Sequence, residues 1–135
     1  SANKALRPGG WLVVEDFDMR TAAFTDPELP DWAEVHFTMI EALSKIGLDL
    51  LTGSRVVHLL RSSGLRDVRA EGSVRSMSIP ELAPAFLPAL ERLRPLLDGG
   101  IAAERVDRTI DTFTRTNGDL PTAYTPMLVS VAGRR

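Results

Sequence analysis

A short apolar run near the start of the chain constrains the fold more than any other feature of these 135 residues. Residues 11–14 (Trp-Leu-Val-Val) follow a turn at residues 8–10 and contain no polar residue at alternate positions. A strand with this pattern is expected to be covered on both faces, as in a sheet flanked by helices. The run ends abruptly in acidic residues, starting at Glu15. The pattern predicts a buried strand over residues 11–16, in an α/β fold, with carboxylates at its carboxyl end.

Residues 31–63 are predicted to form a helical insertion after this strand. Apolar residues recur at helical spacing from Asp31 to Ile46, and Asp31 is placed to cap the first helix. A second helix over residues 54–63 is expected to stop at Gly64. The alternation that follows, over residues 67–77, predicts a strand, and its arginines suggest that this strand lies at a sheet edge.

A second helical insertion is predicted over residues 79–117. Ser78, with Pro80 and Glu81 behind it, has the pattern of a helix start. Three further prolines, at positions 84, 88 and 95, each remove a backbone donor, so we expect a kinked or broken helix there. A final apolar segment predicts a closing strand over residues 124–132.

Composition excludes several classes of protein. Hydrophobic residues make up 44% of the chain and charged residues 25%, as in soluble globular proteins. The formal net charge of -2 gives no basic footprint for nucleic acid. Cysteine is absent, which excludes disulfides and suits a reducing cytosol, and no apolar run is long enough to span a membrane. We therefore expect a cytoplasmic protein that binds neither nucleic acid nor membrane, and the two histidines lack the spacing of a metal site.

Three segments carry a resemblance to a known family. Leu6-Arg7-Pro8-Gly9-Gly10, followed by the apolar strand, resembles the region around the fifth strand of class I S-adenosylmethionine-dependent methyltransferases. The segment at residues 59–65, which precedes Asp67-Val68, is similar to the helix-glycine-strand passage of that family, and residues 127–135 are similar to its closing strand. With its two helical insertions, nearly the whole chain looks like the small-molecule methyltransferases of bacterial secondary metabolism.

This resemblance implies the C-terminal part of a Rossmann-like methyltransferase fold. Its fifth, seventh and sixth strands would be present, with the seventh antiparallel between the other two. The donor-binding parts of the family, a glycine-rich turn and an acid that holds the ribose, come earlier in its sequence and are not found here. The complete enzyme would transfer a methyl group from S-adenosylmethionine to a small organic acceptor. This chain would supply the acceptor side and the lid, and is expected to be inactive by itself.

The candidate site lies at the carboxyl end of the first strand, because ligands of open α/β sheets bind there. Glu15, Asp16, Phe17 and Asp18 would line the pocket edge. Asp16 would orient the acceptor or take its proton, although a solvated or helix-capping acid would have the same pattern. His36 would act as a general base from the first insertion helix, or it would be a partly buried histidine hydrogen-bonded to the backbone.

Two aromatic residues complete the predicted acceptor site, and one rival function stays open. Trp32 would wall an apolar pocket or belong to the ordinary core, and Tyr124 is a weaker pocket candidate. The rival is a non-catalytic domain that serves in dimerisation or binding, whereas a dehydrogenase half-domain would need catalytic residues that we do not find. With its fourth strand missing, the apolar first strand would have a free edge, so a homodimer is expected.

Overall fold

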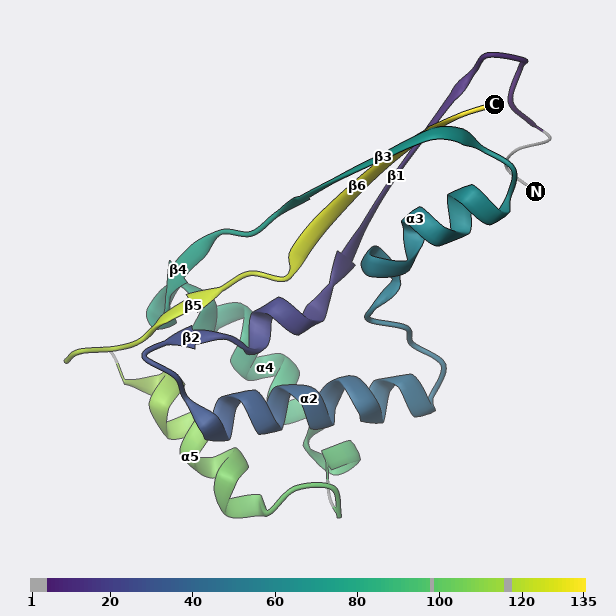
Figure 1. The fold of residues 1–135 in the computed structure, drawn as a ribbon. Coiled ribbons are helices and arrows are strands. Elements are labelled where there is room, and N and C mark those ends of the chain that lie inside the picture. Colours follow the sequence, from purple (N-terminus) through teal and green to yellow (C-terminus); the bar gives the residue numbers. More distant parts are fainter. Residues whose placement is uncertain (1–4, 98, 116–117) are drawn as a thin grey trace.

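The computed structural model describes residues 5–97, 99–115 and 118–135. In this part of the chain the fold is mixed α/β, with two three-stranded antiparallel sheets and four α-helices (Figure 1). In chain order the elements are β1 (Trp11–Asp18), the 3₁₀ helix η1 (Met19–Ala23), β2 (Thr25–Asp26), α2 (Pro30–Lys45), α3 (Thr52–Ser62), β3 (Arg66–Ser73), β4 (Ser76–Ser78), α4 (Ile79–Leu97), α5 (Ala103–Thr114), β5 (Thr122–Tyr124) and β6 (Met127–Arg134).

The first sheet has the order β1-β6-β3. Strand β6 is central and runs antiparallel to both neighbours, and its register with β1 extends from the pair Trp11 and Arg134 to the pair Asp18 and Met127. Strands β1 and β3 are therefore parallel to each other, and their carboxyl ends lie at the same end of the sheet. The expectation that the closing strand lies between the other two is confirmed, as is the edge position of β3 within the described residues.

The second sheet continues the first. Its order, β2-β5-β4, repeats that of the first sheet, because β1 leads into β2, β5 into β6, and β3 into β4. Hydrogen bonds join the strands at the junction: Thr125 N donates to the Arg75 carbonyl at 2.9 Å, and Thr21 Oγ1 donates to the Thr125 carbonyl at 2.9 Å. The two sheets form one ribbon that is interrupted at a single level (Figure 1).

This interruption corrects two expected strands. Residues 67–77 form two strands, β3 and β4, and the expected closing strand over residues 124–132 is likewise divided between β5 and β6. Pro126 explains the second break, since it cannot donate to the sheet ladder. Opposite it, Arg75 N donates to the Thr125 side chain at 3.0 Å instead of to a backbone carbonyl.

Helix α3 covers one face of the first sheet. Its core with the sheet consists of Val56, Leu60, Leu65, Val129 and Val131. On the other face Trp11, Val13 and Phe17 have exposed fractions of 49%, 62% and 51%. The expectation of a strand covered on both faces is therefore wrong for the described chain, because every second side chain of β1 points away from α3. An apolar run shows which residues prefer burial, but it does not supply the element that buries them.

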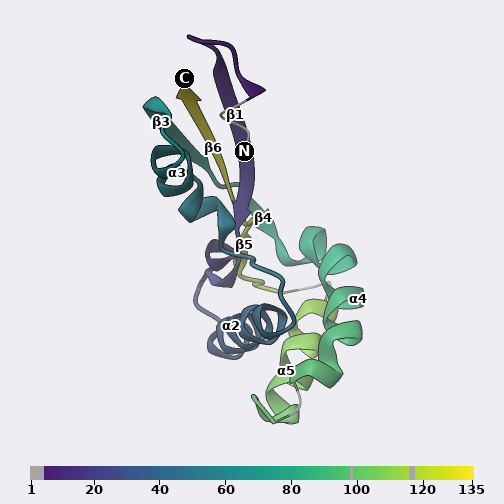
Figure 2. The ribbon, with the colours of Figure 1, turned by 90° about the vertical axis from the view of Figure 1, so that its right-hand side faces the viewer.

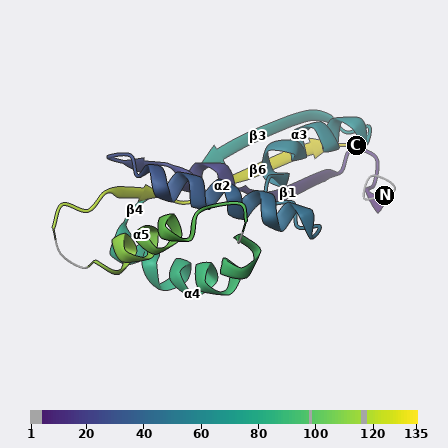
Figure 3. The same cartoon turned by 90° about the horizontal axis from the view of Figure 1, so that it is seen from below.

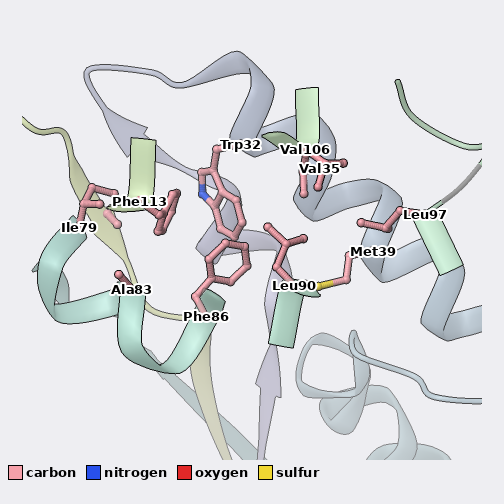
Figure 4. Packing of buried hydrophobic residues seen from close by; sticks show 11 residues of the cluster. Trp32, Val35, Met39, Ile79, Ala83, Phe86, Leu90, Leu97, Val106 and Phe113 are labelled. Carbon is pink, nitrogen blue, oxygen red and sulfur yellow. The ribbon is translucent and has the colours of Figure 1, made fainter. Parts of the chain in front are cut away.

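Helices α2, α4 and α5 pack beside the second sheet and form a separate core (Figures 2 and 3). Three aromatic rings lie at its centre (Figure 4): the ring centroids of Trp32 and Phe86 are 4.3 Å apart, and those of Phe86 and Phe113 are 4.8 Å apart. Val35, Met39, Leu90 and Val106 are among the buried residues that complete it. The two hydrophobic cores make the molecule two-lobed, with the sheet running through both lobes.

Of the kinked or broken helix that was expected here, the break is not found, because helix α4 is continuous from Ile79 to Leu97. It includes Pro84, Pro88 and Pro95, and all three prolines are exposed. Each proline deprives the carbonyl four residues earlier of its usual intrahelical donor. The residues that carry these carbonyls are also exposed. Water can therefore satisfy the carbonyls on the outer side of the helix while its inner side packs without a break.

Asp31 does not cap α2. The N-cap is Leu29, which makes no side-chain capping bond, and Pro30 occupies the start of the helix, where its missing N–H costs nothing. Asp31 lies in the first turn and accepts hydrogen bonds from Arg108, at 2.7 Å from Nε, and from Arg105. The hydrogen bond from Arg108 lowers the pKa of Asp31. The carboxylate thus joins α2 to α5 instead of closing the end of its own helix.

Candidate functional site

The candidate site is built where β1 ends and α3 begins. Gly53, in the first turn of α3, lies so close to β1 that an added Cβ would be 2.8 Å from the carbonyl carbon of Phe17 and 2.9 Å from the carbonyl oxygen of Asp16. Both contacts are with backbone, which cannot rotate away as a flexible side chain can. Only glycine allows the helix to start against the strand at this distance.

Asp18 is buried at this junction, with an exposed fraction of 1%. Its carboxylate accepts hydrogen bonds from Arg20, at 3.0 Å from the backbone N and 2.9 Å from Nε. The side-chain hydrogen bond from Arg20 lowers the pKa of Asp18 despite the opposing effect of burial. The ionised carboxylate is committed to holding η1 in place, so its position matches the helix-capping alternative for this acidic segment.

The other acidic-segment residues are divided between the two faces of the sheet. Asp16 is half-buried on the face covered by α3, and its Oδ1 accepts a hydrogen bond from Phe17 N at 2.7 Å. Glu15 and Phe17 lie on the open face, where Glu15 accepts a hydrogen bond from the Ser130 hydroxyl. The four predicted pocket-edge residues are therefore near one another in the chain but do not converge on one point. Glu15 and Asp16 each keep one carboxylate oxygen without a hydrogen-bond partner among the described residues, and of the two Asp16 lies on the face covered by α3.

His36 packs under η1 and is almost completely buried, with an exposed fraction of 1%. Its Nε2 is 2.7 Å from the carbonyl oxygen of Met19. A carbonyl can only accept, so Nε2 carries the proton and Nδ1 is the basic nitrogen. Within the described chain Nδ1 is buried without a partner. Burial lowers the pKa of His36, and the residue is neutral at pH 7. A proton acceptor is present, but α2 and η1 enclose it.

The buried histidine predicts a pH dependence of stability. Since the folded-state pKa of His36 lies below the unfolded value of 6.5, the unfolded chain binds a proton that the folded chain does not. The free energy of unfolding should therefore fall as the pH is lowered through this value, and the loss should level off below the folded-state pKa. Urea unfolding between about pH 7.5 and 5 stays above the range in which most carboxylates titrate.

We expect this decline to be weaker in His36→Gln and unchanged in the control His58→Gln, which alters an exposed histidine. An equal decline in all three proteins would show that other groups cause it.

The two aromatic candidates lie in the second lobe. Trp32 is enclosed in the hydrophobic core, and its Nε1 donates to the Ala22 carbonyl at 2.9 Å, so it has the position of the core alternative. Tyr124 is half-buried in β5, opposite Ser76 of β4. Neither ring is in the same place as Asp16. The structure thus does not gather the predicted aromatic and acidic residues into one pocket.

A groove that the sequence did not reveal runs between α2 and α3, with a volume of about 340 Å³. Its lining residues are Ile40, Glu41, Ser44, Lys45, Asp49, Leu50, Leu51 and Arg55. It adjoins the end of β1, because Met19 N donates to the Leu50 carbonyl at 3.0 Å. Arg55 and Asp49 form an ion pair in its wall. Three of the eight lining residues come from the loop between α2 and α3, which has no hydrophobic periodicity, and the one signal in the sequence is a glycine at the start of α3.

Models of known protein families give no match to this chain, and curated protein sequences give no significant match. Within the described ranges, no three His, Asp or Glu side chains group as a metal site. In the same residues, no helix combines the length and the apolar character needed to cross a bilayer.

Proposed function

We propose that this chain is the acceptor-side half of a class I S-adenosylmethionine-dependent methyltransferase that acts on a small organic molecule in the cytoplasm. The sheet order β1-β6-β3 carries the proposal. A strand from the end of the chain lies antiparallel between two strands that are parallel to each other, which is the order that the resemblance implies for the fifth, seventh and sixth strands. The open face of this sheet, and the outer edge of β1, which pairs with no other strand in the described part of the chain, leave room for the remainder of such a domain.

Donor binding is assigned to another part of the protein. Gly9 and Gly64 have positive φ angles, of 78° and 88°, but both precede strands. Gly53 does start a helix, but the backbone of β1 fills the space in front of it. The described residues therefore offer no glycine-rich cradle between a strand and a helix, and we assign no step of donor binding to them.

The residues of this chain would act on the acceptor. When a methyl group moves from the donor sulfonium to a hydroxyl or amine, the carbon–sulfur bond breaks with its electron pair left on sulfur, and the acceptor forms one bond to carbon and loses one proton. The acceptor therefore needs a group that orients it and takes the proton. Asp16, with a free carboxylate oxygen at the end of β1, fits this role. The groove between α2 and α3 would hold the acceptor in line with the methyl group, and this orientation would raise the rate of transfer. His36 would contribute only when α2 moves away from η1 and uncovers Nδ1.

Kinetics of the complete enzyme test this assignment. In the polypeptide that joins this chain to its donor-binding half, Asp16→Asn and His36→Ala should each lower kcat with the acceptor by about tenfold or more, since general acid–base groups contribute at least this much. The dissociation constant of S-adenosylmethionine should change less than about twofold, because neither residue is on the donor side.

Asp111→Asn and His58→Ala serve as matched exposed controls. Circular dichroism would check that each variant is folded. Wild-type rates in both test variants would refute the site assignment. Stoichiometric binding of the donor to the isolated 135-residue chain, measured by calorimetry, would refute the placement of the donor site.

The second candidate function is a dimerisation module, and the open face of the sheet favours it. Trp11, Val13 and Phe17 form an exposed apolar row along an edge strand, and such rows mark association surfaces. We expect the isolated chain to form a homodimer that Val13→Lys converts to monomers. Light scattering over a dilution series measures this, with Leu59→Lys on the outer side of α3 as the matched control. A wild-type chain that stays monomeric at high concentration would exclude this function.

A further inference from the structure

A basic pocket lies at the other end of the first sheet, where β1 and β3 begin. Its volume is about 420 Å³, and it is lined by Gly9, Arg66, Asp67, Arg134 and Arg135. Three arginines and one aspartate thus line a single cavity in a chain whose formal net charge is -2. The carboxyl end of β1, with Asp16, is at the opposite end of the strand, so this pocket is separate from the candidate methyl-transfer site.

A bulge in β3 creates an unfavourable pair at this pocket. From Arg69 onward each residue of β3 faces β6 in one register, in which Arg69 is opposite Ala132. Continued without change, this register would place Asp67 opposite Arg134 and make a favourable pair of opposite charges. Instead the register shifts, and Arg66 lies opposite Arg134. Like charges that face each other across strands destabilise a sheet.

The backbone at the bulge is also strained. Asp67 has a φ of 52°, in the left-handed region that residues other than glycine seldom adopt. Bulges redirect side chains and often occur beside binding sites. The observed bulge therefore has a strained residue and a pair of like charges. The continued register would have had an ordinary ladder and a pair of opposite charges. An anion between the two guanidinium groups would remove the electrostatic cost of this arrangement.

The arginines have donors free for such an anion. Arg134 Nε donates to the Gly9 carbonyl at 3.3 Å, and the Arg135 guanidinium donates to the Leu6 carbonyl, which fixes the two groups at the pocket wall. Among the described residues, Arg66 makes no side-chain hydrogen bond or ion pair. Each guanidinium has five N–H donors, so most of them remain available to a ligand.

We propose that this pocket binds the phosphate group of a small phosphorylated molecule. A single guanidinium group can bind phosphate oxygens through two parallel hydrogen bonds, and several guanidinium groups can share one dianion. The volume falls within the range of small-molecule sites, about 300–1,000 Å³, so it accommodates an organic group attached to the phosphate. Asp67 in the wall limits how much negative charge the pocket accepts. The inference does not depend on methyl transfer.

Titration of the 135-residue chain with inorganic phosphate and with glycerol phosphate tests the proposal. Amide chemical shifts in nuclear magnetic resonance spectra, recorded at constant ionic strength, should show saturable changes at Arg66, Asp67 and Arg134. We expect Arg66→Gln and Arg134→Gln to weaken phosphate binding by about tenfold or more, the loss that follows from removing a charged hydrogen-bonding group. Asp67→Asn should strengthen binding, because it removes a repelling charge.

The matched control is Arg92→Gln, which alters an exposed arginine of α4 in the other lobe and should leave binding unchanged. Without phosphate, Arg66→Gln should unfold at the same temperature as wild type or higher, because it removes the like-charge pair. The proposal is overturned by shifts that do not saturate, by equal shifts with chloride at the same ionic strength, or by Arg92→Gln weakening binding as much as Arg66→Gln. It is also overturned if Asp67→Asn binds phosphate more weakly than wild type.

Discussion

Replacement of Trp32 by alanine is expected to lower the free energy of unfolding by about 4 kcal/mol, near the middle of the range for large aromatic side chains in cores. The indole is 2% exposed, and its ring packs against those of Phe86 and Phe113 with centroid distances of 4.3 and 5.1 Å. The substitution also leaves the Ala22 carbonyl without its 2.9 Å hydrogen bond from Nε1. The loss combines a cavity among three helices with an unpaired buried acceptor.

Urea unfolding followed by circular dichroism measures this loss. Trp32→Phe should cost less, because it keeps most of the buried ring and loses mainly the hydrogen bond. Trp11→Ala, which removes a half-exposed indole, is the control and should cost less than about 1 kcal/mol. A loss below about 1 kcal/mol for Trp32→Ala as well would mean that the Trp32 ring is not the centre of the second core. In Trp32→Ala the fluorescence of Trp11 reports the first lobe, and a transition separate from that of circular dichroism would show that the lobes unfold independently.

Gly53→Val is expected to destabilise the chain by about 2–3 kcal/mol, the upper part of the range for overpacking. A Cβ at this position would lie 2.8 Å from a carbonyl carbon of β1, so α3 must move away from the strand. Valine has a higher helix propensity than glycine, so propensity alone predicts a small gain in stability. The sign of the change in the free energy of unfolding therefore distinguishes overpacking against β1 from helix propensity.

Equilibrium urea unfolding of Gly53→Val gives this sign. Arg61→Val, which puts the same side chain on the exposed face of α3, is the matched control and should change stability little. A stabilised Gly53→Val protein would contradict the close packing of α3 on β1. Movement of α3 would also widen the groove beside Asp49. In the complete enzyme the variant should therefore change the affinity for the acceptor more than the affinity for the donor.

Several parts of the fold could be predicted from the sequence, because local patterns determine them. The apolar run of β1, the helical spacing of α2 and the glycine after α3 each predicted an element close to its observed bounds. The order of the strands came from the resemblance to a family and not from spacing, because periodicity contains no information about which strands pair. The breaks between β3 and β4 and between β5 and β6 depend on one another across the ladder, so neither segment reveals them alone.

Charged and proline residues were harder to interpret than apolar ones. Asp31 had the residue type of an N-cap, but two arginines of α5, far away in the sequence, determined its role. The prolines of α4 were expected to kink or break it, but the helix is unbroken and each proline is exposed to water. In both cases the tertiary surroundings of the side chain decided the outcome: a partner helix for Asp31 and solvent for the prolines. A single sequence does not show these surroundings.

The sequence did not predict how the candidate site residues are arranged. The end of β1 lies against the start of α3, and Met19, directly after β1, contacts the buried His36. The alternation of a strand, however, sends Glu15 and Phe17 to one face and Asp16 and Asp18 to the other, and the period of two could have predicted this division. The loop that lines the groove was not predictable, because a hydrogen bond from Met19 to Leu50 places it.

The interrupted ribbon gives the molecule a mechanical axis. All three connections between the sheets cross at one level, and two of them, residues 74–75 and 125–126, are only two residues long. Connections this short do not allow the lobes to slide or separate, so their relative motion is confined to rotation about a line across the ribbon. The contact between His36 and Met19 lies beside this line. Rotation of one lobe against the other would therefore change the contact between His36 on α2 and Met19 in the connection between the sheets.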